Sequence, residues 1–235
     1  MAMNSFDRSA TYYKIIGANC CGNYPYKLGL NTLADNGEIF NKEPICGPGG
    51  LYFCSIKYIF IYLNHGDKLC TLTIPYDAQV VKVYNKYKAD QIYIEKMMEI
   101  NDDTIKYLIE HGADVTADNN RAMYLAIDID DLEMIKLFVK YGVDITVDDN
   151  FPIQFASAKG HLEIVKYLVE CGADITADSS YVIGWAAYCG HLEVIKYLIE
   201  HGADATAHNN YAIRSAAKNG HSEVVECLAE HGAVL

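Results

Sequence analysis

Apolar residues along residues 102–235 follow the spacing of amphipathic helices. Within residues 192–200, Leu192, Ile195 and Ile199 are separated by three and four positions, and charged residues stand between them. One apolar stripe at this spacing predicts a helix that packs on one side and meets water on the other. A similar four-residue sequence recurs at residues 105–108, 135–138, 165–168, 195–198 and 225–228, so a helix is predicted at each of these places.

A glycine follows each predicted helix, and these glycines stand 30 residues apart, at positions 112, 142, 172, 202 and 232. A left-handed residue at the end of a helix is usually a glycine. Three of the helices are preceded by Gly-His at 160–161, 190–191 and 220–221, and before that by small residues at 156–157, 186–187 and 216–217. Small residues let one helix approach the next closely. A unit of this size cannot bury its apolar face alone, so stability is expected from stacking.

The phrase that runs from Gly190 to Asp204 resembles an ankyrin repeat, whose familiar unit has about 33 residues and a T-P-L-H turn. Here the unit has 30 residues, and that turn is replaced by residues 151–154, 181–184 and 211–214. The resemblance implies paired helices, stacking and protein binding, with a shortened hairpin between units. Repeat units of this shortened kind, which begin with residues such as Tyr211-Ala212-Ile213-Arg214, are similar to those of ankyrin proteins from giant viruses that infect amoebae.

Two domains are expected: a small α+β amino-terminal domain over residues 1–98, followed by an all-α ankyrin-repeat solenoid over residues 99–235. The solenoid begins with a half repeat near 99–113, because residues 91–98 do not match a first helix, so the preceding segment must cover its open side. Whole helix-turn-helix units are expected near 114–143, 144–173, 174–203 and 204–235.

The front domain has short runs rich in Tyr, Ile and Val between turn residues, a pattern typical of strands. Strands are predicted at residues 12–16, 51–54, 69–74, 79–84 and 91–95. A helix is predicted at residues 55–64, capped by Ser55 and ended near Gly66. The phrases at 26–30, 46–53, 74–78 and 87–90 resemble the domain that precedes ankyrin repeats in many mimivirus-type proteins, and this resemblance implies no activity.

Charge and composition exclude several classes of protein. The formal charge is -12, and the acidity lies in residues 91–235, which hold ten basic and 24 acidic residues. This charge disfavours nucleic acid as a partner. The most apolar run, residues 56–63, is too short for a membrane span, and the start lacks the apolar run of a secretion signal, so a cytoplasmic location is expected. The eight cysteines show neither C-x-x-C pairs nor zinc-finger spacing and are expected to be reduced.

Three groups of residues with candidate chemistry have simpler interpretations. Gly47, Gly49 and Gly50 lack the Lys-Ser/Thr of a phosphate-binding loop, which favours a tight turn into a strand. The recurring histidines at 161, 191 and 221 lie in units expected about 10 Å apart, too far to share a metal ion. Cys46, Cys54 and His65 could form a catalytic pair, but nothing places them together. No metal, cofactor or enzyme activity is therefore predicted.

Candidate partner-binding residues come from comparing the units with one another. Repeat scaffolds keep framework residues and vary exposed ones, and the pairs that vary before Gly-His are Asp128, Ile129, Ala158, Lys159, Tyr188, Cys189, Lys218 and Asn219. Positions 111, 141, 171, 201 and 231 vary too, and neutral drift on a solvated face would look the same. Phe151, Tyr181 and Tyr211 form a stripe at the predicted hairpin, which suits partner contact or a packing ladder equally.

The sequence therefore predicts a non-enzymatic module, a monomer, that binds a protein on the concave face of its repeats. A basic patch on the partner would complement the acidic repeats. In a giant virus the partner would be a host protein. The alternatives left open are an enzyme in the front domain that the repeats deliver to a target, a substrate adaptor for ubiquitin ligases, and a virion component.

Overall fold

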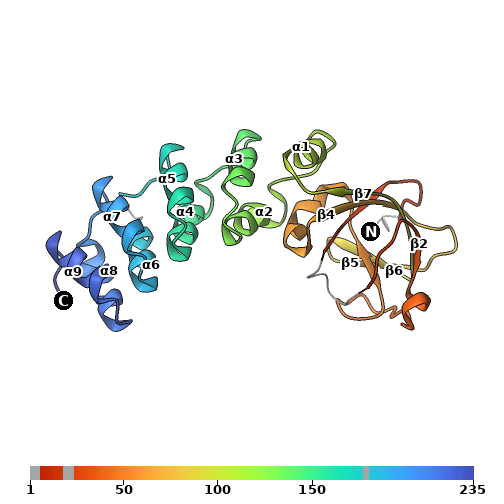
Figure 1. Ribbon diagram of the computed structural model, residues 1–235, viewed down its shortest axis with the longest axis horizontal. Helices are drawn as coiled ribbons and strands as arrows, with labels where there is room; N and C mark the ends of the chain where they lie inside the picture. Colours follow the sequence, from red (N-terminus) through yellow and green to blue (C-terminus); the bar gives the residue numbers. More distant parts are fainter. Residues whose placement is uncertain (1–5, 18–23, 177–179) are drawn as a thin grey trace, which may run out of the picture. The chain divides into compact units, whose positions relative to one another are not determined.

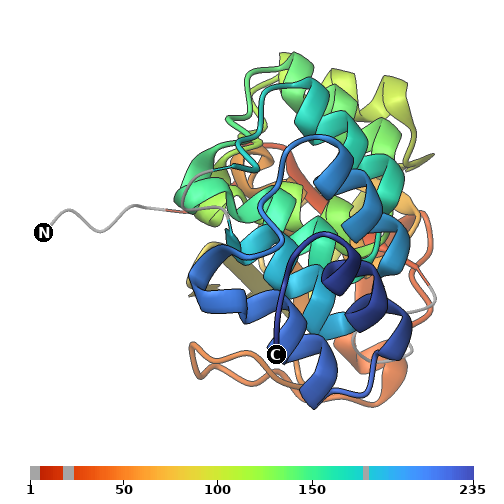
Figure 2. The same cartoon turned by 90° about the vertical axis from the view of Figure 1, so that its left-hand side faces the viewer.

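The structure is a computed structural model, which describes residues 6–17, 24–176 and 180–235. Two compact units, Met1–Ala122 and Met123–Leu235, make up the chain. Strands dominate the first unit, and paired helices form the second, where they are coloured from green to blue (Figure 1) and are seen from the C-terminal pair in Figure 2. This confirms the predicted fold class, whereas the boundary near residue 98 and the repeat limits stay predictions.

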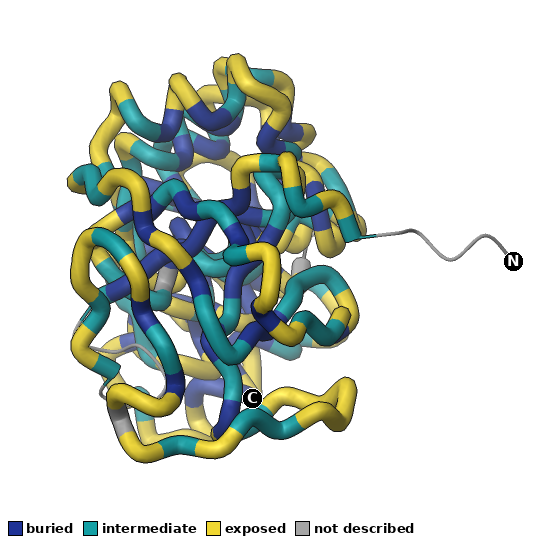
Figure 3. Tube along the Cα trace, turned by 90° about the vertical axis from the view of Figure 1, so that its right-hand side faces the viewer, coloured by how far each residue is buried: buried dark blue, intermediate teal, exposed yellow. Residues whose placement is uncertain are grey.

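Two antiparallel sheets build the front domain. The first has the order β1-β4-β7-β2, with β1 at Tyr12–Ile16, β4 at Lys68–Thr73, β7 at Gln91–Glu99 and β2 at Gly29–Thr32. The second has the order β3-β6-β5, with β3 at Leu51–Phe53, β6 at Lys86–Ala89 and β5 at Val80–Val83. In Figure 3 the buried segments are dark blue and the exposed loops yellow.

Strands β2 and β6 were not predicted. Each has only four residues, which is too short for a clear pattern: β2 lacks the alternation of apolar and polar side chains, and Lys-Tyr-Lys-Ala of β6 alternates over two pairs only. In β6 the buried residues are Lys88 and Ala89, so a charged side chain occupies an inward position. Both strands form because neighbouring strands provide backbone partners: β2 pairs with the longer β7, and β6 pairs with both β3 and β5.

The predicted helix at 55–64 is a 3-10 helix, η2, at Ile56–His65, and the predicted cap by Ser55 is wrong because the Ser55 side chain makes no capping hydrogen bond. Isoleucine, tyrosine and phenylalanine, which fill this segment, are weak α-helix formers. Ile59 and Phe60 are fully buried, so tertiary packing rather than propensity holds the segment. The predicted end at Gly66 is confirmed.

The core of the front domain joins the two sheets through aromatic rings. Tyr12 of β1, Phe53 of β3 and Tyr87 of β6 contact one another, and Phe6 stacks on Tyr12 with ring centroids 5.0 Å apart. Leu72 of β4 is among the fully buried side chains of the same core. These rings are therefore part of the packing between the two sheets.

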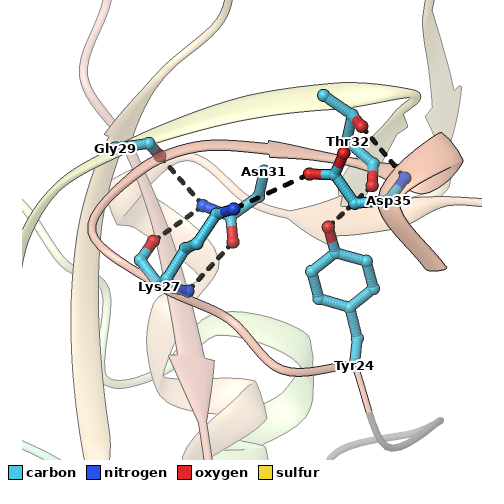
Figure 4. A network of polar contacts seen from close by, with 6 residues as sticks. All are labelled: Tyr24, Lys27, Gly29, Asn31, Thr32 and Asp35. Carbon is cyan, nitrogen blue, oxygen red and sulfur yellow. Dashed lines mark hydrogen bonds and ion pairs between the residues drawn. The ribbon is translucent and has the colours of Figure 1, made fainter.

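A polar network fixes the loop between residues 24 and 35 (Figure 4). The buried side chain of Asn31 accepts a hydrogen bond from Lys27 N and donates to the carbonyl oxygens of Lys27 and Gly29. Tyr24 donates to the carbonyl oxygen of Thr32 at 2.7 Å. A 3-10 helix, η1, follows at Leu33–Asn36. The loop that carries Tyr24 is thus held in one conformation by bonds to its own backbone.

The repeat helices alternate between first and second helices of each unit. The second helices are α1 (Asp102–Glu110), α3 (Leu132–Lys140), α5 (Leu162–Glu170), α7 (Leu192–Glu200) and α9 (Ser222–Glu230). The first helices are α2 (Ala117–Asp128), α4 (Val147–Lys159), α6 (Ser180–Cys189) and α8 (Ala207–Lys218). Strand β7 directly precedes α1, and the predicted half repeat near 99–113 stays a prediction.

A left-handed turn of three residues opens the first helices. It comprises residues 118–120, 148–150 and 208–210, all with φ between +47° and +61°. Aspartate, asparagine and histidine occupy these positions, and asparagine and aspartate are the residues other than glycine that best tolerate this conformation. The equivalent positions before α6 fall partly on residues 177–179, which lie outside the described residues.

The left-handed turn corrects the predicted position of the aromatic stripe. Phe151 and Tyr211 follow the turns directly and lie in the first helical residues of α4 and α8, and Tyr181 lies in α6. They are therefore helix residues rather than hairpin residues. The reason is that the turn uses only three residues, so helical conformation begins earlier than in a longer hairpin.

Small residues at the contacts between first helices allow α4, α6 and α8 to pack side by side. Ala156, Ala186, Ala187 and Ala216 are fully buried, as the sequence predicts. Ala217 of α8, in contrast, is exposed. The second helices bury their apolar stripes in the same way.

Candidate functional site

The candidate site is the outward face of the first helices, which we call the first-helix face. It comprises residues 121, 124, 125 and 128 of α2 and the residues 30, 60 and 90 positions later in α4, α6 and α8. Positions 121, 125 and 128 are separated by four and three residues, and 124 lies three residues after 121 and four before 128, so on each helix the four positions share one side. The inward side of the same helices carries the buried small residues, which fixes the direction in which this face points.

Helix α6 presents three large aromatic side chains on this face. Tyr181, Trp185 and Tyr188 have exposed fractions of 52%, 40% and 46%. The rings of Trp185 and Tyr188 lie edge to face with centroids 5.9 Å apart. Monomeric proteins rarely leave such a group of aromatic side chains in water, and tryptophan and tyrosine are enriched among the residues that dominate binding energy.

Gly184, on the same side of α6, is buried because Tyr211 of α8 covers it. A Cβ atom at Gly184 would stand 2.8 Å from the Tyr211 ring. Tyr211 therefore packs against α6, whereas Tyr181 stays half exposed. The two tyrosines share a sequence position but differ in what they touch.

The face of α4 is aromatic too, but its rings pack on one another. Phe151 and Phe155 are stacked with centroids 5.9 Å apart, and Tyr124 of α2 meets Phe151 edge to face at 5.3 Å. The Tyr124 hydroxyl donates to Asp148 Oδ2 at 2.9 Å. Burial, and then the hydrogen bond and charge of Asp148, raise the pKa of Tyr124 to about 12. This side chain is therefore a neutral donor at physiological pH.

Two of the predicted partner-binding residues pair with each other. Lys159 Nζ lies 2.5 Å from Asp128 Oδ1 and 5.4 Å from the centroid of the Phe155 ring. The Asn219 side chain donates to the carbonyl oxygen of Ser215, inside its own helix. Ile129, Cys189 and Lys218 are exposed at helix ends, and Ala158 is half-buried. The structure thus places these residues along one edge of the first-helix face, and their contact with a partner stays a prediction.

Sequence comparison among the units missed Trp185, Phe155 and Tyr124 as members of the face. The signal was present, because residues 181, 185 and 188 are separated by four and three positions and all are aromatic. Spacing alone does not mark these residues as exposed, because a large apolar residue at helical spacing is usually part of the core. Exposure, which only the structure gives, separates the two cases.

The recurring histidines are structural. His191 Nε2 lies 2.9 Å from the carbonyl oxygen of Ala158, and His221 Nε2 lies 3.0 Å from that of Tyr188, so each ring ties its unit to the one before. Within the described ranges no three His, Cys, Asp or Glu side chains gather in a way that could hold a metal ion.

The variable residues before the terminal glycines cap the second helices. The Nδ1 atoms of His111, His201 and His231 lie 2.7–2.8 Å from the carbonyl oxygen four residues earlier. A histidine at the carboxyl end of a helix meets carbonyl groups that lack partners within the helix. These three histidines therefore serve the helix ends.

The fold and this face define a class: a stacked helix-pair solenoid with a Gly-His turn is a repeat protein of the ankyrin type. A family model described as "Ankyrin repeats (3 copies)" matches residues 96–179 and 154–235, more than half of the chain. The chain belongs to the ankyrin-repeat family, whose members generally act as non-enzymatic modules for protein–protein interaction.

The similar curated proteins come from Acanthamoeba polyphaga mimivirus. An uncharacterized protein of that virus is 37% identical over 132 residues, which cover 53% of this chain and 94% of the relative. Two putative ankyrin repeat proteins are 36% and 32% identical, over 48% and 44% of this chain. The alignments cover 35% and 18% of those two relatives, so they share only part of their length with this chain. Among the described helices, none combines the length and the apolar character needed to cross a membrane.

Proposed function

We propose that this protein binds a partner protein through the first-helix face, with the aromatic residues of α6 as the centre of the contact. The observation that carries the proposal is the exposure of Tyr181, Trp185 and Tyr188 on one side of one helix. Covering three aromatic side chains removes a large apolar area from water, at about 25 cal/mol per Å². No comparable group of large exposed side chains is found on another repeat helix among the described residues.

The face is built in advance of binding, which favours affinity. Its side chains stand on helices rather than on loops, and Trp185 and Tyr188 already contact each other. A partner therefore orders little chain when it binds, so the entropy cost is reduced. A polar rim surrounds the aromatic centre, with the Asp128–Lys159 ion pair on one side and Lys218 on the other.

The partner we propose is a host protein with a basic surface, met in the host cytoplasm. Support comes from the mimivirus origin of the three relatives and from the excess of acidic residues over residues 91–235. The glutamates of the second helices are partly neutralised by lysines three residues on, as in the Glu163–Lys166 contact at 2.7 Å. Opposite charge on the partner would speed encounter, and this effect falls as salt rises.

The experiment is affinity capture from amoeba lysate with three forms of the full chain. These are the natural sequence, the double variant Trp185→Ala/Tyr188→Ala, and Tyr76→Ala, which removes a side chain that is 92% exposed and belongs to the front domain. We expect a protein that the natural chain and Tyr76→Ala recover and the double variant loses. Direct binding is then measured through Trp185, the single tryptophan of the chain, whose emission should shift to shorter wavelength when a partner covers it.

Equal recovery of every captured protein by all three forms would contradict the proposal. The double variant must first be shown to be folded by its far-UV circular dichroism and thermal midpoint. Because both substituted side chains are about half exposed, we expect the midpoint to change little.

A further inference from the structure

The front domain holds a cavity of about 440 Å³ that the repeats do not use. It lies within the first unit, beside the glycine-rich turn at residues 47–50, which forms part of its wall. Small-molecule sites commonly have volumes of about 300–1,000 Å³. The cavity is therefore of the size that holds one small organic molecule.

Cationic side chains line this cavity. Lys14, Lys86 and His65 contribute to its wall, and Glu38 is the acidic residue found there. Glu38 accepts a hydrogen bond from Gly49 N at 3.2 Å, so the turn already partly satisfies its carboxylate. Burial lowers the pKa of His65, and the positive charges of Lys14, Lys86 and Arg121 lower it further. His65 is thus neutral at physiological pH, and the two lysines outweigh the one carboxylate.

The lysines are held in place by neighbours rather than left to solvent. Lys14 is 9% exposed, its Nζ donates to the carbonyl oxygen of Tyr52 at 2.9 Å, and it lies 4.6 Å from the centroid of the Tyr26 ring. Lys86 Nζ lies 4.6 Å from the centroid of the Tyr52 ring. Because an ammonium group has three donors, Lys86 can also donate to a bound ligand.

Aromatic rings supply the other part of the wall. Tyr24, Tyr26 and Tyr52 line the cavity, and Tyr24 and Tyr26 lie against each other with centroids 4.6 Å apart. The bond from Tyr24 to Thr32 shown in Figure 4 fixes the first ring, and the Tyr52 hydroxyl accepts from Gly47 N at 2.9 Å. Lys14 and Lys86 lie over one face of the Tyr26 and Tyr52 rings, so a flat group would stack on the aromatic surface that the lysines do not cover.

The glycine-rich turn is shaped by close packing. A Cβ atom at Gly49, where φ is +81°, would stand 2.5 Å from the carbonyl oxygen of Ile39, and one at Gly50 would stand 2.8 Å from the side chain of Lys88. Glycine at these positions brings the backbone against the loop at residues 39–41 and against β6. The turn can therefore form a wall of the cavity without filling it with side chains.

We propose that this cavity binds a small phosphorylated molecule that carries a flat ring, of the size of a nucleoside monophosphate. The phosphate would meet Lys86 and Lys14, and the ring would stack on the tyrosines. The site is separate from the first-helix face, so binding here and partner binding by the repeats can fail independently. No chemical step is assigned to the cavity.

The test is isothermal titration calorimetry on the full chain with three probes: adenosine 5′-monophosphate, adenosine and inorganic phosphate. We expect the monophosphate to bind one to one, and adenosine and phosphate each to bind at least about tenfold more weakly, because each lacks one of the two groups that the wall recognises. Equal affinity for adenosine and its monophosphate would overturn the role of the lysines. Equal affinity for inorganic phosphate and the monophosphate would overturn the role of the rings, and absence of binding at millimolar monophosphate would overturn the site.

A matched pair of variants tests the position of the site. Lys86→Met should weaken monophosphate binding about tenfold or more, since it removes one charge-assisted contact. Lys82 lies on the same β5–β6 hairpin, but its side chain is exposed and lies outside the cavity. The control variant Lys82→Met should therefore change the affinity for the monophosphate less than about twofold. Equal binding by Lys86→Met and the natural chain would contradict the proposal.

A measurement on the natural chain covers the case in which Lys86→Met does not fold. Nuclear magnetic resonance shifts on addition of the monophosphate should fall on the amides of residues 47–52 and on the His65 ring. Shifts confined to the repeat helices would place the ligand elsewhere and overturn the proposal.

Discussion

His191 lies across Gly160. A Cβ atom at Gly160 would stand 2.5 Å from His191 Nδ1, and the other nitrogen of the ring lies 2.9 Å from the carbonyl oxygen of Ala158. Gly190 and His221 repeat the arrangement one unit later, with the same distance of 2.5 Å. The Gly-His dipeptide is thus a contact between units: the glycine of one unit leaves room for the histidine of the next.

The first complete unit breaks this pattern. Asp130, with φ of 58°, stands where the later units have glycine. His161 meets the Asp130 carboxylate through Nδ1 at 3.2 Å, and its buried Nε2 has no hydrogen-bond partner within the described part of the chain. A side chain at position 130 therefore changes which nitrogen of the histidine ring contacts the preceding unit: Nδ1 in His161, but Nε2 in His191.

Gly160→Ala should destabilise the repeats more than Gly172→Ala does. Both glycines have positive φ, +78° and +96°, which costs an alanine about 1–2 kcal/mol. Only Gly160 has a neighbour within 4 Å, and the clash with His191 should add about 1–3 kcal/mol. Urea unfolding followed by circular dichroism measures both. Equal losses would show that the His191 contact is unimportant.

Asn150 should tolerate glycine better than alanine. Its φ is 61°, and its side-chain oxygen accepts a hydrogen bond from Asp174 N at 3.3 Å in the next turn between units. Asn150→Gly loses that bond, worth about 0.5–1.5 kcal/mol, but suits the left-handed conformation. Asn150→Ala loses the bond and adds about 1–2 kcal/mol of backbone cost. Thermal unfolding of the two variants should rank them in this order, and the reverse order would count against the turn described here.

Tyr124→Phe should remove part of the loss of stability at alkaline pH. The folded pKa of Tyr124, about 12, lies above the ordinary value of 10.0, so the proton is held more tightly in the folded chain. Its contribution to stability is complete below pH 10 and is lost as the pH rises toward 12, by up to about 1.4 kcal/mol per pH unit.

Urea midpoints at pH 9 and pH 11 measure this effect. The midpoint should fall further for the natural chain than for Tyr124→Phe, because the other tyrosines with raised pKa values are present in both. A fall of the same size in both would show that Asp148 and burial do not act on Tyr124 in this way.

The ion pair between Asp128 and Lys159 should contribute little to stability in spite of its length of 2.5 Å. The two side chains are 45% and 41% exposed, and exposed pairs contribute less than about 1 kcal/mol. A double-mutant cycle with Asp128→Asn and Lys159→Met measures the coupling. It should be below about 1 kcal/mol and should shrink at high salt. A larger coupling that salt does not change would indicate a pair shielded from water.

The repeats could be predicted closely because their signals are local. The spacing of Leu192, Ile195 and Ile199, the glycine at each helix end and the Gly-His dipeptide act within one unit, and the structure confirms the helices that they predict. The hairpin position given to Phe151 was wrong, since the left-handed turn uses three residues whose conformation is favoured only weakly by their type.

The candidate sites could be predicted only in part. Tyr188 and Tyr181 were found by comparison among units, but Trp185 was not, because the same spacing suits a core residue and an exposed one. In the front domain, Lys14 and Lys86 are 72 positions apart along the chain and share a cavity wall. No pattern in the sequence brings such residues together.

The sequence by itself determined the period, the helix pairs and the family, because each of these depends on contacts between residues a few positions apart and on repetition of one unit. The tertiary structure alone decided which aromatic side chains stay in water, which nitrogen of His161 meets Asp130, and that two lysines and three tyrosines surround a cavity. The physical reason is that exposure and long-range contact depend on how the sheets and helices pack, which local preference does not specify.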